Sequence, residues 1–132
     1  MTFLNVMHAR QICHVCETVG PRLVGRQQIR PDIEHVSYRL IDHAAPQIDP
    51  NLDFMLVDAA RTIAALRHDG HDVLLHCVAA QSRTPAVATA YSVLRGVPAD
   101  RALEEVLVAL PAANPNPGFR ADLHRLAATT SP

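Results

Sequence analysis

The chain has 132 residues, of which 48% are hydrophobic and 19% are charged, and its formal net charge at pH 7 is −1. This length predicts a single domain over residues 1–132 with enough apolar side chains to form a core. The near-neutral charge argues against a broad basic surface for nucleic acid or for an anionic membrane. No apolar run is long enough to cross a membrane. The three cysteines, with no secretory signal, predict free thiols and a cytoplasmic location.

The first third of the chain predicts two strands with a helix between them. Phe3–Met7 is a short apolar run of the kind that forms a buried strand. A set of apolar residues then recurs at helical spacing: Ile12, Val15, Cys16 and Val19. This pattern predicts a helix that ends at Gly20. Residues 21–34 show no period and predict a loop, whereas His35–Ile41 is rich in β-forming side chains and predicts a strand.

The middle of the chain predicts helix, strand and helix. Asp49 is placed to cap a helix whose first residue is Pro50, and Gly70 is placed at its carboxyl end. Val73–Leu75 is wholly apolar, which is typical of a central parallel strand buried on both faces. The helix that opens at Thr84 is apolar nearly all round, which is typical of a helix buried in the core.

Two amphipathic helices complete the pattern, at about 99–110 and 118–128, and the proline-rich segment Pro111–Gly118 joins them as a loop. Strands that alternate with helices predict an α/β fold in which a central, mostly parallel sheet is flanked by helices. Ligands of such sheets bind at the carboxyl ends of the strands. The end of the Val73–Leu75 strand is therefore the first place to look for a site.

The residues that follow this strand have the chemistry of an oxyanion site. They are His76, Cys77, Val78, Ala79, Ala80, Gln81, Ser82, Arg83 and Thr84. A short loop that returns into a helix N-terminus directs backbone N–H groups and the helix dipole at one anion of phosphate shape. Arg83 adds a planar fork for two oxyanion oxygens. The same positive field is expected to lower the pKa of Cys77 and to make it a nucleophile.

His76-Cys77, followed by five residues and then Arg83-Thr84, resembles the signature of the cysteine-dependent protein phosphatases. The flanking strand and helix and the Pro115–Phe119 segment are similar to the compact dual-specificity branch. The resemblance implies that fold and a metal-independent phosphoric monoester hydrolase that forms a cysteinyl-phosphate and needs no cofactor. It implies a protein phosphatase for phosphotyrosine and/or phosphoserine and phosphothreonine, with no nucleic-acid, membrane or metal partner.

The resemblance also assigns roles to residues outside the nucleophile. Thr84 stands where the family places a hydroxyl that hydrogen-bonds the departing thiolate, and His76 matches the histidine that orders the loop. The proton donor for the leaving group is matched by Asp42, which directly follows the second predicted strand. Asp49 is the rival position for the same acid.

The phosphate-binding loop runs from Val78 to Arg83. Its residues 78–81 are neutral, which favours a phosphorylated protein or a small phosphoester over a polyanionic lipid. Ala80 stands where the family usually has glycine, the residue that adopts a positive φ without strain. An alanine there is expected to strain a turn of positive φ or to crowd the phosphate, which bears on the rate and not on the type of reaction; whether it lowers the activity is left open.

Two other classes of function fit part of the pattern. One is a module that binds phosphate without turnover, and the other is a different thiol enzyme, such as a sulfurtransferase or an arsenate reductase. The intact pair of Cys77 and Arg83 weighs against the first, and the position of the loop past mid-chain weighs against the second.

Cys13 and Cys16 lack a second cysteine pair for zinc, and a disulfide between either of them and an oxidised Cys77 is left open.

Overall fold

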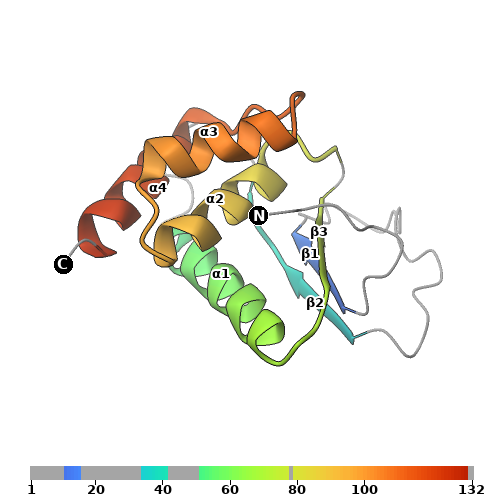
Figure 1. Cartoon of the computed structure of the whole chain (residues 1–132). Helices are drawn as coiled ribbons and strands as arrows, with labels where there is room; N and C mark the ends of the chain where they lie inside the picture. The colour runs from blue at the N-terminus through green and yellow to red at the C-terminus, as the bar shows by residue number, and fades with distance from the viewer. Residues whose placement is uncertain (1–10, 16–33, 42–50, 78, 131–132) are drawn as a thin grey trace.

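The computed structural model describes residues 11–15, 34–41, 51–77 and 79–130 (Figure 1). The described elements, in chain order, are β1 (Gln11–Val15), β2 (Glu34–Tyr38), α1 (Leu52–His68), β3 (Val73–His76), α2 (Arg83–Leu94), α3 (Ala99–Ala109) and α4 (Pro117–Thr130). In these parts of the chain, no helix is both long enough and apolar enough to cross a membrane.

The three strands form one parallel sheet in the order β2-β1-β3. β1 pairs with β2 over its full length and with β3 on its other side, where His14 lies opposite His76. Because the strands are parallel, their carboxyl ends meet at one edge of the sheet. Cys77 follows directly after β3 at this edge. The predicted α/β fold with a mostly parallel sheet is confirmed.

The predicted helix through Ile12 and Val15 is wrong over residues 11–15, which form β1. In so short a run, apolar residues three apart also fit a strand, so the spacing alone does not decide between the two. Pairing on both sides decides for the strand, because it gives the backbone N–H and C=O groups partners in two neighbouring strands. The rest of that predicted helix, and the predicted strand Phe3–Met7, lie outside the described residues.

Two further predictions are corrected by the structure. Among the described strands, β3 is an outer strand of the sheet and is half-buried. The central strand is β1, although the sequence predicted that position for β3. The first long helix starts at Leu52 with Asn51 as its N-cap, not at Pro50 capped by Asp49. The carbonyl of Asn51 accepts the N–H of Met55 at 2.9 Å, which makes Asn51 the residue where helical hydrogen bonding begins.

Helix α2 is the centre of the helical layer, as its all-round apolar composition predicts. It packs against α1, α3 and α4, and Figure 1 shows it between them. Every residue from Thr84 to Val93 is buried. A helix without a solvent-facing side is held against rotation and sliding by close packing around it. The N-terminus of α2, which follows the loop after β3, is therefore held in a fixed position.

The sheet is joined to the helices by a small polar contact and by a shared core. The hydroxyl of Tyr38, at the end of β2, donates to a carboxylate oxygen of Asp58 at 3.0 Å and lies 2.6 Å from the hydroxyl of Thr62, both on α1. Leu40, which follows β2, is fully buried in the same cluster as Phe119 of α4. These contacts hold the end of β2 and Leu40 against α1 and the helical core.

Candidate active site

The loop between β3 and α2 brings a cysteine and an arginine to the same sheet edge. Cys77 is half-buried, and Arg83 is half-buried at the first turn of α2. Ala79 and Gln81 are exposed at the rim of the loop, whereas Ser82 is buried. Val78 lies outside the described residues. The loop therefore places a half-buried thiol just before the N-terminus of α2, which carries partial positive charge, and Arg83 lies in the first turn of that helix.

The surroundings of Cys77 favour its thiolate. Burial raises the pKa of the thiol, but hydrogen bonds to the sulfur from the Thr84 hydroxyl and from the backbone N–H groups of Thr84, Ala80 and Ala79 lower it more. The net effect places the pKa of Cys77 below that of an ordinary cysteine. Because the thiolate is the nucleophilic form of cysteine, this lowering of the pKa makes Cys77 more reactive towards electrophiles than an ordinary cysteine.

Thr84 is held in place to make its hydrogen bond to the sulfur. Its side chain is buried, and its hydroxyl forms no hydrogen bond of standard length and angle among the described residues, but it lowers the pKa of Cys77, which identifies the sulfur as its neighbour. A buried hydroxyl left without any hydrogen bond is costly. The interaction with the Cys77 sulfur is therefore the one that offsets the burial of this hydroxyl. The role that the resemblance assigns to Thr84, a hydrogen bond to the departing thiolate, stays a prediction.

Ala80 has a φ of 54°, and it is the non-glycine residue with positive φ in the described part of the chain. An L-residue in this region brings its Cβ close to the following carbonyl oxygen, a contact that glycine avoids. The strain expected from an alanine at this position is therefore present. In this conformation the Ala80 N–H reaches the Cys77 sulfur.

The segment before α4 is hydrogen-bonded to the loop, a contact that the sequence did not reveal. The N–H of Asn114 donates to the carbonyl of Gln81 at 2.6 Å. The N–H of Asn116 donates to the hydroxyl of Ser82 at 3.0 Å. The only signal in the sequence was the Pro115–Phe119 segment that resembles the phosphatases, and it gave no spatial relation to the loop.

The structure describes only some of the remaining predicted site residues. His76 ends β3 and is half-buried beside Cys77. Asp42 and its rival Asp49 lie outside the described residues, so their roles stay predictions. The parallel pairing nevertheless puts the end of β2, from which the chain leads to Asp42, at the same sheet edge as Cys77.

The predicted cysteine pairing also stays a prediction. Cys13 lies in β1 in register with Leu75, and Cys16 lies outside the described residues. In the residues that the structure describes, no three histidine, cysteine or acidic side chains form a group that could hold a metal ion.

Comparison with known proteins agrees with the geometry of the loop. No protein-family sequence model matches the chain. Mouse dual specificity phosphatase 28 is 36% identical over 108 residues, which cover 80% of this chain and 59% of that protein. Rat dual specificity protein phosphatase 15 is 31% identical over 96 residues, which cover 71% of this chain and 40% of that protein. The chain thus spans about half the length of these relatives.

A solved structure decides the family. The crystal structure of a mouse putative dual specificity phosphatase, complexed with zinc tungstate, matches with a TM-score of 0.72 and 31% identity over 92% of this chain and 72% of that one. The chain belongs to the dual specificity phosphatase family. At Ala80, where the resemblance led us to expect glycine, the backbone has a left-handed conformation that glycine adopts without strain.

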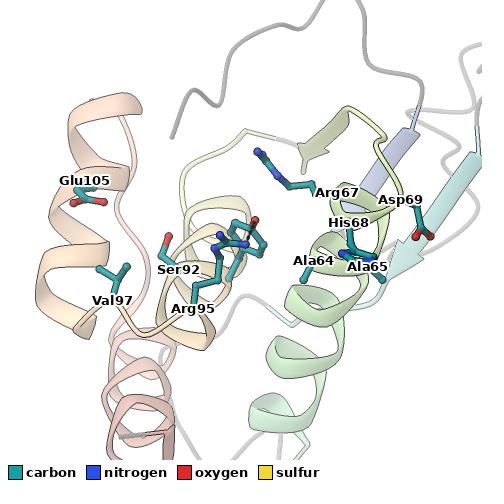
Figure 2. Close-up of a pocket in the computed structure, with 10 residues that line it drawn as sticks. Ala64, Ala65, Arg67, His68, Asp69, Ser92, Arg95, Val97 and Glu105 are labelled. Carbon is teal, nitrogen blue, oxygen red and sulfur yellow. Dashed lines mark hydrogen bonds between the residues drawn. The ribbon is translucent and has the colours of Figure 1, made fainter.

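A hollow of this family member lies away from the loop. A pocket of about 840 Å³ opens where α1 and α2 end, with Arg67, Arg95 and Glu105 around it (Figure 2). The guanidinium carbons of Arg67 and Arg95 lie 5.9 and 5.5 Å from the ring centroid of Tyr91. Neither Cys77 nor Arg83 lines this pocket. Its arginines lie at helix carboxyl ends, where cations are favourable, and we assign it no part in the site.

The hydrogen bond from Thr84 gives the first testable prediction for this phosphatase-family chain. Thr84→Val removes the hydroxyl and keeps the side-chain shape, so the pKa of Cys77 should rise and less thiolate should be present near neutral pH. The rate of Cys77 alkylation by iodoacetamide, followed by mass spectrometry across a pH series, should have its midpoint at higher pH than in the wild type.

Thr89→Val is the matched control for this measurement. Thr89 lies on the same helix and is fully buried, but its hydroxyl donates to the carbonyl of Pro85 at 2.8 Å instead of to Cys77. The midpoint for Cys77 should stay at its wild-type value in this variant. Equal midpoints in all three proteins would show that Thr84 does not stabilise the thiolate.

Proposed function

We propose that the chain is a phosphoric monoester hydrolase that dephosphorylates proteins through a cysteinyl-phosphate on Cys77. The observation that carries the proposal is a half-buried free thiol whose pKa is lowered by hydrogen bonds from the loop and from Thr84. Membership of the dual specificity phosphatase family and the arginine at the same loop support it. A mouse relative is complexed with tungstate, an oxyanion of phosphate shape.

In the first step of the proposed reaction, the Cys77 thiolate attacks phosphorus. The S–P bond forms as the bond from phosphorus to the leaving oxygen breaks, and Asp42 gives its proton to that oxygen. Arg83 and the N–H groups of the loop bind the other three phosphate oxygens. Donors already aimed at the place where charge develops stabilise the transition state without reorganising during the reaction.

In the second step, water attacks the phosphorus of the cysteinyl-phosphate. Asp42, now a carboxylate, takes a proton from the water, and the S–P bond breaks to release inorganic phosphate and the Cys77 thiolate. The hydroxyl and N–H of Thr84 hydrogen-bond the departing sulfur, and this makes the thiolate a better leaving group. No metal ion or cofactor takes part in either step.

The substrate we propose is a phosphotyrosine or phosphoserine and phosphothreonine side chain of a protein, or a small phosphoester. Ala79 and Gln81, which are exposed at the rim of the loop, carry no positive charge that would select a polyanionic lipid. We also propose that the protein acts in the cytoplasm, because a reducing compartment keeps a low-pKa thiol such as Cys77 in its active form.

Hydrolysis of para-nitrophenyl phosphate tests this proposal and separates it from the alternatives. The wild type should turn over this ester in the presence of EDTA. Cys77→Ser should abolish turnover and keep phosphate binding, because Arg83 and the loop N–H groups remain. Arg83→Ala should weaken phosphate binding and turnover together.

Other results of the same assays would assign the chain to another class of protein. Phosphate binding by a wild type that does not turn over would make the chain a binding module. Activity on thiosulfate or arsenate without phosphoester hydrolysis would make it another thiol enzyme. More than a few per cent of wild-type activity in Cys77→Ser would exclude covalent catalysis by this cysteine.

The role of Asp42 gives a separate prediction. The alkaline limb of the pH profile of kcat/KM should report the loss of the proton that Asp42 donates. Asp42→Asn should therefore flatten that limb and lower the rate on a phosphoserine ester by about 10²–10³-fold. The loss on para-nitrophenyl phosphate should be smaller, because its leaving group needs less help from a proton.

Asp49→Asn serves as the matched control for Asp42, since it makes the same substitution at the rival acid. Because Asn51 rather than Asp49 caps α1, this variant should keep both its stability and its alkaline limb. The reverse pattern, with the limb lost in Asp49→Asn and kept in Asp42→Asn, would move the acid to Asp49.

A further inference from the structure

Ala80 is held in a conformation that its own side chain opposes. Its φ of 54° is a left-handed value that alanine rarely adopts. Strained backbone of this kind persists only where the surrounding structure fixes it. The contacts that fix Ala80 should therefore be found on the residues next to it.

The two residues that follow Ala80 are both bound by the segment before α4. The carbonyl of Gln81 accepts the N–H of Asn114 at 2.6 Å, and the hydroxyl of Ser82 accepts the N–H of Asn116 at 3.0 Å. Ser82 is buried, so its bond to Asn116 is partly shielded from water. These two bonds hold the loop just after Ala80 in the sequence, whereas Cys77 comes before it.

Arg120 ties that segment to α4. Its Nε donates to the carbonyl of Pro115 at 2.9 Å, and a terminal nitrogen of its guanidinium donates to the side-chain oxygen of Asn114 at 3.2 Å. Pro115 is fully buried. The next residue back along α4, Phe119, is fully buried in the core, so the helix that carries Arg120 is anchored. A rigid fork with two separate acceptors fixes their relative position.

We propose that Arg120 is a positioning residue that, through Asn114 and Pro115, keeps the phosphate loop in the strained Ala80 conformation that directs the Ala80 N–H at the Cys77 sulfur. The proposal rests on the proposed function in one respect, which is that this loop binds phosphate. Arg120 does not touch Cys77 or the bound anion in this account and acts only through the segment before α4.

The proposal predicts that Ala80 and Arg120 depend on each other. With glycine at position 80 the same backbone is unstrained, so the loop should keep its shape with less help from Arg120. With alanine, loss of the Arg120 hydrogen bonds should let φ relax and turn the Ala80 N–H away from Cys77. A double-mutant cycle measures this dependence directly.

The cycle consists of the wild type, Ala80→Gly, Arg120→Met and the double variant. Methionine keeps much of the apolar stem of Arg120 and removes its donors. Arg120→Lys keeps one donor for the Pro115 carbonyl and should restore part of the effect. Arg101→Met on α3 is the control for loss of an arginine, because Arg101 is exposed and pairs only with Glu105 among the described residues.

Two readouts are followed at the Cys77 peptide by mass spectrometry, and neither needs turnover. The first is the pH midpoint of alkylation by iodoacetamide. The second is the concentration of inorganic phosphate that protects Cys77 from alkylation. The groups that flank Cys77 on β3 and α2, His76 and Arg83, are the same in every variant. The charge that Arg120→Met removes is lost equally with alanine and with glycine at position 80, so the difference between these two backgrounds reports the loop.

Arg120→Met should move the alkylation midpoint to higher pH and raise the protecting phosphate concentration by about tenfold, the effect of losing one well-placed hydrogen bond to a charged group. Adding Ala80→Gly to this variant should return both values to within about threefold of the wild type. Arg101→Met should leave both values unchanged. Arg120→Lys should lie between Arg120→Met and the wild type.

Two results would overturn the proposal. One is that Arg120→Met lowers the melting temperature but leaves the midpoint and the phosphate protection unchanged, since Arg120 would then be merely structural. The other is that the effects of Arg120→Met are equally large with alanine and with glycine at position 80. Failure of the proposed function gives a different result, because phosphate would then not protect the wild type while the coupling in the alkylation midpoint would persist.

Discussion

The hydrogen bonds that converge on the Cys77 sulfur are the interaction on which the rest of the site depends. The donors come from Ala79 and Ala80 in the loop and from Thr84 in the first turn of α2. They meet at one atom only while β3 and α2 keep a fixed relation. Pairing with β1 holds β3, and burial on every side holds α2. Loop residues shape the site, and the sheet and the helical core keep that shape.

Much of this arrangement follows from the sequence because it is encoded locally. The sequence shows an apolar strand, then a short loop with cysteine and arginine, then an apolar helix. This order predicts both the elements and the end of the sheet at which the site lies. The burial of α2 followed from a composition without a polar face. The position of a helix in the core is well predicted in such a case, because no other placement would bury its side chains.

The parts that the sequence could not predict depend on contacts between distant segments. Residues 11–15 have a spacing that suits a helix or a strand, and only pairing with both β2 and β3 makes them the central strand. The hydrogen bonds from Asn114 and Asn116 to the loop join residues more than thirty positions apart. Polar residues in a proline-rich segment carry no periodic signal that would place them against a particular loop.

The central claim is that Cys77 carries the phosphoryl group during turnover. Mass spectrometry of protein denatured rapidly while it hydrolyses para-nitrophenyl phosphate tests this claim most directly. The account predicts a phosphoryl group on the peptide that contains Cys77, bound to its sulfur and absent in Cys77→Ser. Turnover with a phosphoryl group on another residue, or with no phosphorylated protein at any time, would contradict it.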